Sequence, residues 1–225
     1  TEALGVPTRM VQGRRITDQK SIDATSMVLN GLVNTRILAI CRDLDIDAVG
    51  ISGVDAGLVR AHRRPPVTMS DGETVDFGFV GDIDAVDPTV IRKLLDNGLM
   101  PVISPLSADS HGTLLNINAD TVAAAIGAAL SAEKLILCTG APGILERVED
   151  PSSVISYTDL RGLKKMREDG SIVDGMLPKA KAIEDAIRGG VRRVHVISYQ
   201  APEGILTEVF TNEGTGTLVV ADVNA

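Results

Sequence analysis

Short apolar runs alternate with helical patterns along most of the 225 residues, and this alternation constrains the fold more than any other feature. Ala48–Ser52, Lys134–Thr139 and Arg193–Ser198 have the length and apolar character of strands. Helical patterns precede or separate them, for example at 18–44 and 175–188. The alternation predicts the α/β class, as a three-layer αβα sandwich whose mostly parallel central sheet is covered by helices on both faces.

The remaining elements follow from periodicity and from turn residues. Strands are also predicted at 58–62, 100–104, 113–115 and 217–220, with an antiparallel hairpin within 67–86. Helices are also predicted at 87–97, from Asn118 or Asp120 to Leu130, at 157–168 and at 204–210. Ligands of parallel sheets bind outside the carboxyl ends of the strands, so functional residues are expected just after strands and at helix starts.

The composition limits the classes of partner. Lys and Arg number 22 against 30 Asp and Glu, which gives a net charge of −8, and aromatic residues make up 2% of the chain. A nucleic-acid partner is not expected, because it needs a basic surface and stacking side chains. An anionic metabolite can still bind where cations cluster locally.

Neither a metal site nor a membrane span is predicted. His62, His111 and His195 are scattered without metal-ligand spacing, and no apolar run approaches the roughly 20 residues that span a bilayer. Cys41 and Cys138 lie in apolar stretches and are predicted to be buried thiols in a reducing compartment. Residues 1–5 resemble the tail of a helix rather than a signal peptide, so a cytoplasmic location is expected.

Two arginines stand immediately before the predicted helix at residue 18. A helix start carries partial positive charge, so Arg14 and Arg15 are favourable there only if an anion lies against them. Arginine also matches a carboxylate with two parallel hydrogen bonds. The alternative interpretation is a pair of solvated surface arginines.

Two amides and a carboxylate surround the start of the next predicted helix. Asn116 and Asn118 are two residues apart, so in extended chain they share a face, and Asp120 follows in the first helical turn. Together they could bind a polar substrate and orient cations. The alternative is ordinary helix capping, for which Asn and Asp are preferred.

A lysine falls in the first turns of the helix that Gly175 begins. Lys179 is again a cation at the unfavoured end of a helix, and a bound phosphate would resolve the conflict. The alternative is a solvated lysine. Taken together, cations, amides and one acid at the edges of a parallel sheet suit phosphoryl transfer between two anions, which depends on positioning and electrostatic stabilisation.

Five segments of the chain resemble the motifs of the acetylglutamate kinase family, within the amino-acid kinase superfamily. They are Gly13–Asp18, Gly50–Asp55, Gly98–Ser104, Asn116–Asp120 and Gly175–Lys179. They occur in the family's order and cover nearly the whole chain. The resemblance implies the amino-acid kinase fold as one domain, 1–225, with a substrate-binding lobe at about 1–117 and a nucleotide-binding lobe at 118–225.

The resemblance also implies an activity, which is the ATP-dependent phosphorylation of the side-chain carboxylate of N-acetyl-L-glutamate in arginine biosynthesis. By matching position, Arg15 would hold the substrate's α-carboxylate, Asn116 and Asn118 would bind substrate, Lys179 would stabilise the transferring phosphoryl group and Asp120 would organise the catalytic lysines. The expected ATP contacts are Thr139, Gly140, Gly143, Gly175 and Met176. Mg²⁺ would be bound mainly through ATP phosphates and water, and a homodimer or larger homo-oligomer is implied.

Two departures from the family pattern bear on these expectations. The family has an N-terminal strand with a catalytic lysine and a Gly-rich turn, and then a strand ending in a His-Gly-Gly-type loop, and neither occurs in this sequence. A chain lacking both would be an inactive or unstable fragment. In addition, Gly140 stands where the family often has Asp, which affects the nucleotide contacts.

Two other functions stay open from the sequence. One is a kinase of aminoadipate or glutamate held on a carrier protein, with which Gly31–Asn34 is compatible, whereas the Asn-Ala-Asp form of 118–120 favours acetylglutamate. The other is a non-catalytic, kinase-like binding protein, which the absent lysine motif would suit.

Overall fold

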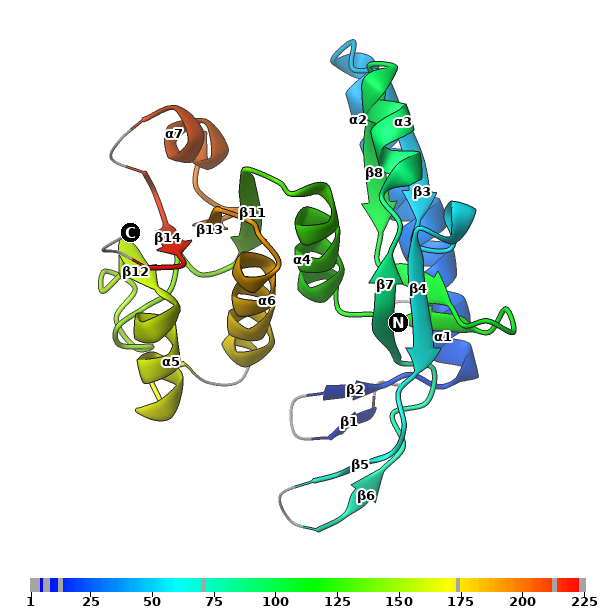
Figure 1. The fold of residues 1–225 in the computed structure, drawn as a ribbon, viewed down its shortest axis with the longest axis horizontal. Coiled ribbons are helices and arrows are strands. Elements are labelled where there is room, and N and C mark those ends of the chain that lie inside the picture. Colours follow the sequence, from blue (N-terminus) through cyan, green and yellow to red (C-terminus); the bar gives the residue numbers. More distant parts are fainter. Residues whose placement is uncertain are drawn as a thin grey trace. The chain divides into compact units, whose positions relative to one another are not determined.

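The computed structural model describes residues 5, 9–11, 14–69, 72–172, 175–211 and 214–222, and of Arg9, Arg14 and Arg15 only the backbone. The chain divides into two compact units, Thr1–Val122 and Ala123–Ala225. Both mix helices and strands, which confirms the predicted α/β class (Figure 1).

The first unit begins with a hairpin and one long helical segment. Strands β1 (Arg9–Val11) and β2 (Arg14–Ile16) pair antiparallel, and the Asp18 side chain then accepts a hydrogen bond from Ser21 N–H, 2.8 Å, to cap the helix start. The helix consists of α1 (Gln19–Ser26), a π-helical segment η2 (Met27–Val33) and α2 (Asn34–Asp43). The predicted helix from residue 18 to about 44 is therefore confirmed.

The long helix packs on a parallel strand pair, β3 (Ala48–Ser52) and β8 (Met100–Ser104), and helix α3 (Thr89–Asp96) also contacts β8. The Asn34 amide donates to the Val102 carbonyl oxygen of β8, 3.0 Å. Gly50 makes this approach possible, because a Cβ there would lie 1.9 Å from Asn34 Oδ1. Both strands have the bounds that the sequence predicts.

A second sheet in this unit has the order β10 (Leu114–Asn116), β9 (Leu106–Ala108), β4 (Val59–Arg63) and β7 (Gly81–Val86). A short hairpin, β5 (Val67–Thr68) with β6 (Thr74–Val75), confirms the antiparallel hairpin predicted within 67–86. The 3₁₀ turn η3 (Asp55–Gly57) precedes β4. Strand β9 is not predicted from the sequence, since it is only three residues long.

The second unit contains a four-stranded sheet of order β11 (Lys134–Thr139), β13 (Arg193–Ser198), β14 (Thr217–Val220) and β12 (Tyr157–Asp159). Strands β11 and β13 are parallel, and β14 is antiparallel to β13 and parallel to β12. Helix α4 (Ala119–Leu130) includes the boundary between the units.

Helices cover both faces of this second sheet. Val194 and Val196 of β13 are buried in a core with residues of α5 (Leu160–Glu168) and α6 (Met176–Arg188). His195 alternates with them and faces α7 (Gly204–Phe210), where its Nδ1 lies 2.6 Å from Glu208 Oε1. The unit is thus layered as helices, sheet and helix.

The Glu208 carboxylate joins three segments at this second face. Its other oxygen accepts hydrogen bonds from Thr215 N–H, 2.6 Å, and Gly216 N–H, 3.1 Å. Burial alone would raise the pKa of Glu208, but the hydrogen bonds from His195, Thr215 and Gly216 and the charge on His195 hold it below its ordinary value. Both side chains are about 5% exposed, so the pair fastens α7 to β13 from within.

Two predictions from the sequence are wrong. The helix predicted at 157–168 begins only at Leu160, because Tyr157–Asp159 pairs with β14 as a strand and the Asp159 carboxylate caps α5 at Gly162 N–H, 2.8 Å. Cys41 is buried as predicted, but Cys138 is exposed. The apolar sequence around Cys138 follows from a strand with one buried face, which leaves alternate residues outside.

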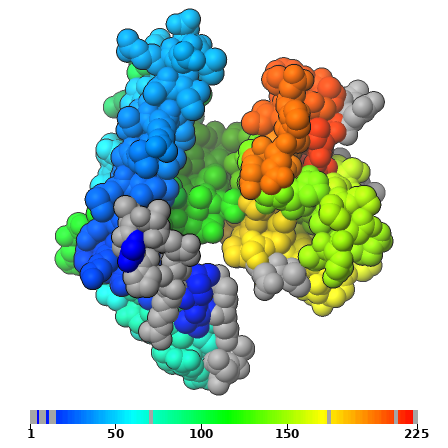
Figure 2. Space-filling model, turned by 180° about the vertical axis from the view of Figure 1, so that it is seen from behind, coloured from blue at the N-terminus to red at the C-terminus, as the bar shows by residue number. Residues whose placement is uncertain are grey.

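The long helix exposes an apolar face. Met27, Leu32, Val33, Ile37, Ile40 and Leu44 are all at least 39% exposed, and the segment lies open on the surface in Figure 2. Residues Gln19–Asp43 form the one helix in the described part of the chain that is long and apolar enough to cross a membrane, by length and composition only. The same helix also carries charged residues such as Arg36 and Arg42.

Candidate active site

In the first unit, backbone bonds to Phe79 connect the segments that carry Arg15 and Asn116. Phe79 N–H donates to the Thr17 carbonyl oxygen, 2.7 Å, and the Phe79 carbonyl oxygen accepts from Asn116 N–H, 2.8 Å. Arg15 lies in β2, two residues before Thr17, and its side chain is outside the described part of the structure. The backbones of these two predicted substrate-binding segments are therefore held next to the same residue, Phe79.

Gly78 makes this connection possible. Its φ is +72°, and a Cβ there would lie 2.2 Å from the Thr17 carbonyl oxygen. Sequence reasoning missed Gly78 and Phe79, although a signal exists, since two of the chain's three phenylalanines, Phe77 and Phe79, flank this glycine.

Asn118 begins helix α4. Its side-chain oxygen accepts hydrogen bonds from Thr121 N–H, 3.1 Å, and Thr121 Oγ1, 3.4 Å. Asp120 follows in the first turn, where a carboxylate is favoured by the helix dipole, and is partly buried, as is Asn116. The capping interpretation is thus confirmed for the Asn118 oxygen, and a role in substrate binding would fall to its amide NH₂ group.

Lys179 is buried in the second unit. It is the fourth residue of α6 and is 8% exposed, so the alternative of a solvated lysine is wrong. Among the described residues no side chain caps this helix start, and Gly175 precedes it with open space where a Cβ would be. Burying an ammonium group is costly unless anionic or polar groups compensate for lost hydration. An uncapped helix start beside a buried cation is suited to a phosphate.

The next predicted ATP contacts lie at the carboxyl end of β11. Thr139 is the last residue of this strand, and Gly140 and Gly143 follow it in the chain. Thr139 and Ser198 are paired as the last residues of parallel strands β11 and β13, and Tyr199 N–H donates to the Thr139 carbonyl oxygen, 3.0 Å. Gly143 is buried against β14, because a Cβ there would lie 2.8 Å from Thr217 Oγ1. Its glycine is therefore required by packing, whatever it contacts in a ligand.

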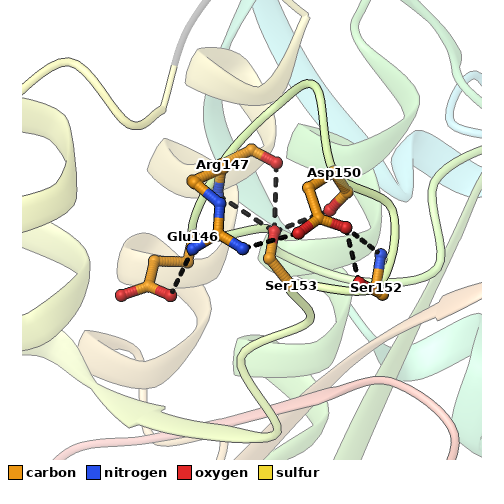
Figure 3. Close-up of polar contacts among 5 residues, drawn as sticks. All are labelled: Glu146, Arg147, Asp150, Ser152 and Ser153. Carbon is orange, nitrogen blue, oxygen red and sulfur yellow. Dashed lines mark hydrogen bonds and ion pairs between the residues drawn. The ribbon is translucent and has the colours of Figure 1, made fainter.

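The loop after Gly143 satisfies its own polar groups (Figure 3). Arg147 Nη2 donates to Asp150 Oδ2 at 2.5 Å. Arg147 Nη1 also forms an ion pair with Glu146 Oε2 at 3.6 Å. Ser152 N–H and Oγ donate to Asp150 Oδ1, and hydrogen bonds from Ser152 and Arg147 hold the pKa of Asp150 below its ordinary value. Arg147 is thus engaged by two carboxylates within its own loop.

The two best-defined hollows among the described residues do not contain the predicted site residues. A groove of about 650 Å³ lies beside α2 and includes Ala48, at the amino end of β3, the edge away from where ligands of parallel sheets bind. A polar cavity of about 100 Å³ lies between Asn34, Ser52 and Asp55. It is smaller than the roughly 300 Å³ at which pockets for metabolites begin.

Comparisons with known proteins identify the family to which the chain belongs. The amino acid kinase family model matches residues 1–198, so the chain belongs to the amino acid kinase family. It is similar to a protein of Streptococcus mutans UA159, whose crystal structure superposes with a TM-score of 0.79 at 26% identity, covering 98% of this chain and 80% of that one.

The curated relatives narrow the family further. The chain is 47% identical to the acetylglutamate kinase of Myxococcus xanthus, over 98% of this chain and 73% of the relative. It is 44% identical to the acetylglutamate kinase of Archaeoglobus fulgidus, over 97% of this chain and 76% of that relative. Within its family the chain thus falls among the acetylglutamate kinases.

Proposed function

We propose that this protein transfers the γ-phosphoryl group of ATP to the side-chain carboxylate of N-acetyl-L-glutamate, which yields N-acetyl-glutamyl 5-phosphate for arginine biosynthesis. The observation that carries the proposal is the similarity to acetylglutamate kinases over nearly the entire chain. The position of Lys179 near the start of α6 supports it, since a helix start with a nearby cation is suited to a phosphate group.

The reaction needs no general base from the protein. A glutamate side chain has an ordinary pKa of about 4.3, so the acceptor is already ionised at neutral pH. Its oxygen forms the new bond to the γ-phosphorus while the bond to the bridging oxygen breaks and ADP leaves. Lys179 would stabilise the charge that develops on the transferring group, which is the main contribution that proteins make to this chemistry.

The first unit would hold the acceptor. Arg15 would pair with the α-carboxylate, and Asn116 and the NH₂ group of Asn118 would hydrogen-bond the substrate. The link through Phe79 supports this division, because it fixes the Arg15 and Asn116 segments relative to one another. Asp120 would orient the lysine ammonium groups of the site.

The second unit would hold the nucleotide, with Thr139, Gly140 and Gly143 at the sheet edge and Gly175 and Met176 at the start of α6. No group of three or more His, Cys, Asp or Glu side chains suited to a metal occurs among the described residues. Mg²⁺ would therefore be held mainly by the ATP phosphates and water, and would neutralise charge on them when bound.

The experiment that tests this function compares acceptors. The full-length protein should phosphorylate free N-acetyl-L-glutamate, measured as ADP release and as hydroxamate formation from the acyl phosphate. Activity restricted to aminoadipate or glutamate attached to a carrier protein would contradict the proposal, and absence of ADP release with every acceptor would favour a binding protein.

We also propose a homodimer in the cytoplasm, formed through the long helix. Val33, Ile37, Ile40 and Leu44 repeat at helical spacing and are exposed, so a second copy could cover them. Ile40→Asp should convert the dimer to monomer in sedimentation velocity, whereas Leu95→Asp, at an exposed residue of α3, should not. Recovery of the intact protein only in the membrane fraction would contradict the cytoplasmic location.

A further inference from the structure

Tyr199 is exposed at the carboxyl edge of the second unit's parallel strands. It follows the last residue of β13, and its N–H is bonded to Thr139, the last residue of β11. Tyr199 is 68% exposed, although the chain contains only two tyrosines and no tryptophan. A large ring left open at the edge where parallel sheets bind ligands requires an account.

The ring lies against Gly140. A Cβ built at Gly140 would be 3.4 Å from Tyr199 Oη, 3.7 Å from Cε1 and 3.8 Å from Cζ. Those are ordinary contact distances, so alanine would fit, but a longer side chain would extend into the ring. Gly140 and Tyr199 therefore form a matched pair, in which the absence of a side chain at one position gives space to the ring of the other.

The two chain segments that carry this pair contain no charged residues. The segments that follow the two strands, 140–143 and 199–202, contain no Asp, Glu, Lys or Arg, and Ala141 and Pro142 are partly buried there. Phosphate groups need cations or helix-start N–H groups, which lie instead at Gly175 to Lys179. An uncharged aromatic ring, by contrast, suits an edge formed by backbone, alanine, proline and tyrosine.

We infer that Tyr199 is a specificity-determining residue for the nucleotide, and that its ring stacks against the purine base while Gly140 leaves room for both. The inference rests on the proposed function only in placing the nucleotide at this edge. It adds a residue outside the motifs that carry the family resemblance, and it gives a reason for Gly140 where the family often has Asp.

The test measures binding of ADP by calorimetry, because this does not depend on which acceptor is phosphorylated. Tyr199→Ala should raise the ADP dissociation constant about tenfold, the typical loss when an aromatic ring stacked on a base is removed. Tyr199→Phe should stay within about twofold of the parent, since the ring is retained. The matched control is Tyr157→Ala, which removes the other tyrosine, 48% exposed on β12, and should leave ADP binding unchanged.

A base-free competitor separates stacking from general damage to the site. Inorganic tripolyphosphate should compete with ADP for binding equally well in the parent and in Tyr199→Ala, because it has no base to stack on the ring. Gly140→Asp should weaken ADP binding as Tyr199→Ala does, since a carboxylate there would occupy the space of the ring. The inference would be overturned if the ADP dissociation constant of Tyr199→Ala stayed within twofold of the parent, or if tripolyphosphate binding weakened as much as ADP binding. It would also be overturned if the parent bound no ADP.

The two proposals fail in distinguishable ways. Normal ADP binding with the expected Tyr199 dependence, but no phosphorylation of N-acetyl-L-glutamate, would remove the proposed acceptor and keep the role of Tyr199. Phosphorylation of N-acetyl-L-glutamate with an unchanged ADP dissociation constant in Tyr199→Ala would do the reverse.

Discussion

Helices α4 and α6 begin in opposite ways. Asn118 caps α4 and Asp120 places a carboxylate in its first turn, so the start of this helix follows the ordinary rules of helix stability. Helix α6 begins after Gly175, which has no side chain to cap it, and buries Lys179 in its second turn. The first arrangement is typical of helix capping, whereas the second places a cation near a helix start preceded by glycine, an arrangement suited to a phosphate group.

The largest expected effect is on turnover. Lys179→Ala in the full-length protein should lower kcat by about a thousandfold while the KM for ATP changes far less, because the ammonium group acts on charge that develops in the transition state. Steady-state kinetics would check this. Lys179→Arg is the matched control, which keeps the charge but not its position. Near-normal turnover of Lys179→Ala would contradict the proposed role of Lys179, and the starts of α4 and α6 would then not differ in function.

Glu208 is a second buried charge, and its compensating partners within the fold can be named. Glu208 is 7% exposed but is paired with His195 and bonded to two backbone N–H groups. Glu208→Gln should lower the free energy of unfolding by about 3 kcal/mol, because it leaves buried partners mismatched. Urea denaturation would measure the loss, and kcat of the folded fraction should hold.

The same carboxylate should make stability depend on acid. The pKa of Glu208 is lower in the folded protein than its ordinary value of 4.5, so its contribution is present above that pH. The contribution is lost as the pH falls through the folded-state pKa. Glu208→Gln should therefore show a shallower decrease of stability below about pH 4.5. An unchanged slope would indicate that other carboxylates dominate.

The helix cap should matter for stability at a smaller scale. Asn118→Ala should lower the free energy of unfolding by about 1 kcal/mol, the usual loss when a capping side chain is removed. Asn118→Asp keeps the capping oxygen, so it should retain most of that stability while losing the NH₂ group proposed for substrate binding. If Asn118→Asp also keeps the KM for acetylglutamate, Asn118 has only the capping role.

The smallest effect on stability is expected at the start of α6. Gly175 has φ −62° and open space around a Cβ, so Gly175→Ala should fold as well as the parent or be more stable by about 0.5 kcal/mol. Any rise in the KM for ATP would then report close approach of the nucleotide to this backbone. Thermal unfolding with and without ATP would separate the two effects.

Local patterns predicted much of the fold. Ala48–Ser52, Met100–Ser104 and Lys134–Thr139 are strands with the predicted bounds, because each is a continuous apolar run of sufficient length. Strand β9 was missed because it is only three residues long, although it pairs with nearby β10, and the equally short β12 was missed because its partner β14 is distant in the chain. For the same reason, helix propensity around Tyr157 gave the wrong assignment.

The candidate site shows the same division. The burial of Lys179 excludes a solvated lysine, which was one of the two interpretations that the sequence left open. Burial depends on packing from several elements. The contacts of Phe79 and the approach of Tyr199 to Gly140 were not predicted, because each joins residues more than 30 positions apart. Motifs indicate which chemical groups are present, but long-range packing determines which of them meet.

The bonds at Phe79 are formed entirely by main-chain atoms, with Thr17 on one side and Asn116 on the other. Among the twenty amino acids only proline, at position 79 or 116, would delete a donor from this pair. The spacing between the two segments can thus persist while the surrounding side chains diverge. A displacement of the β1–β2 hairpin would also be transmitted to Asn116 through these main-chain hydrogen bonds.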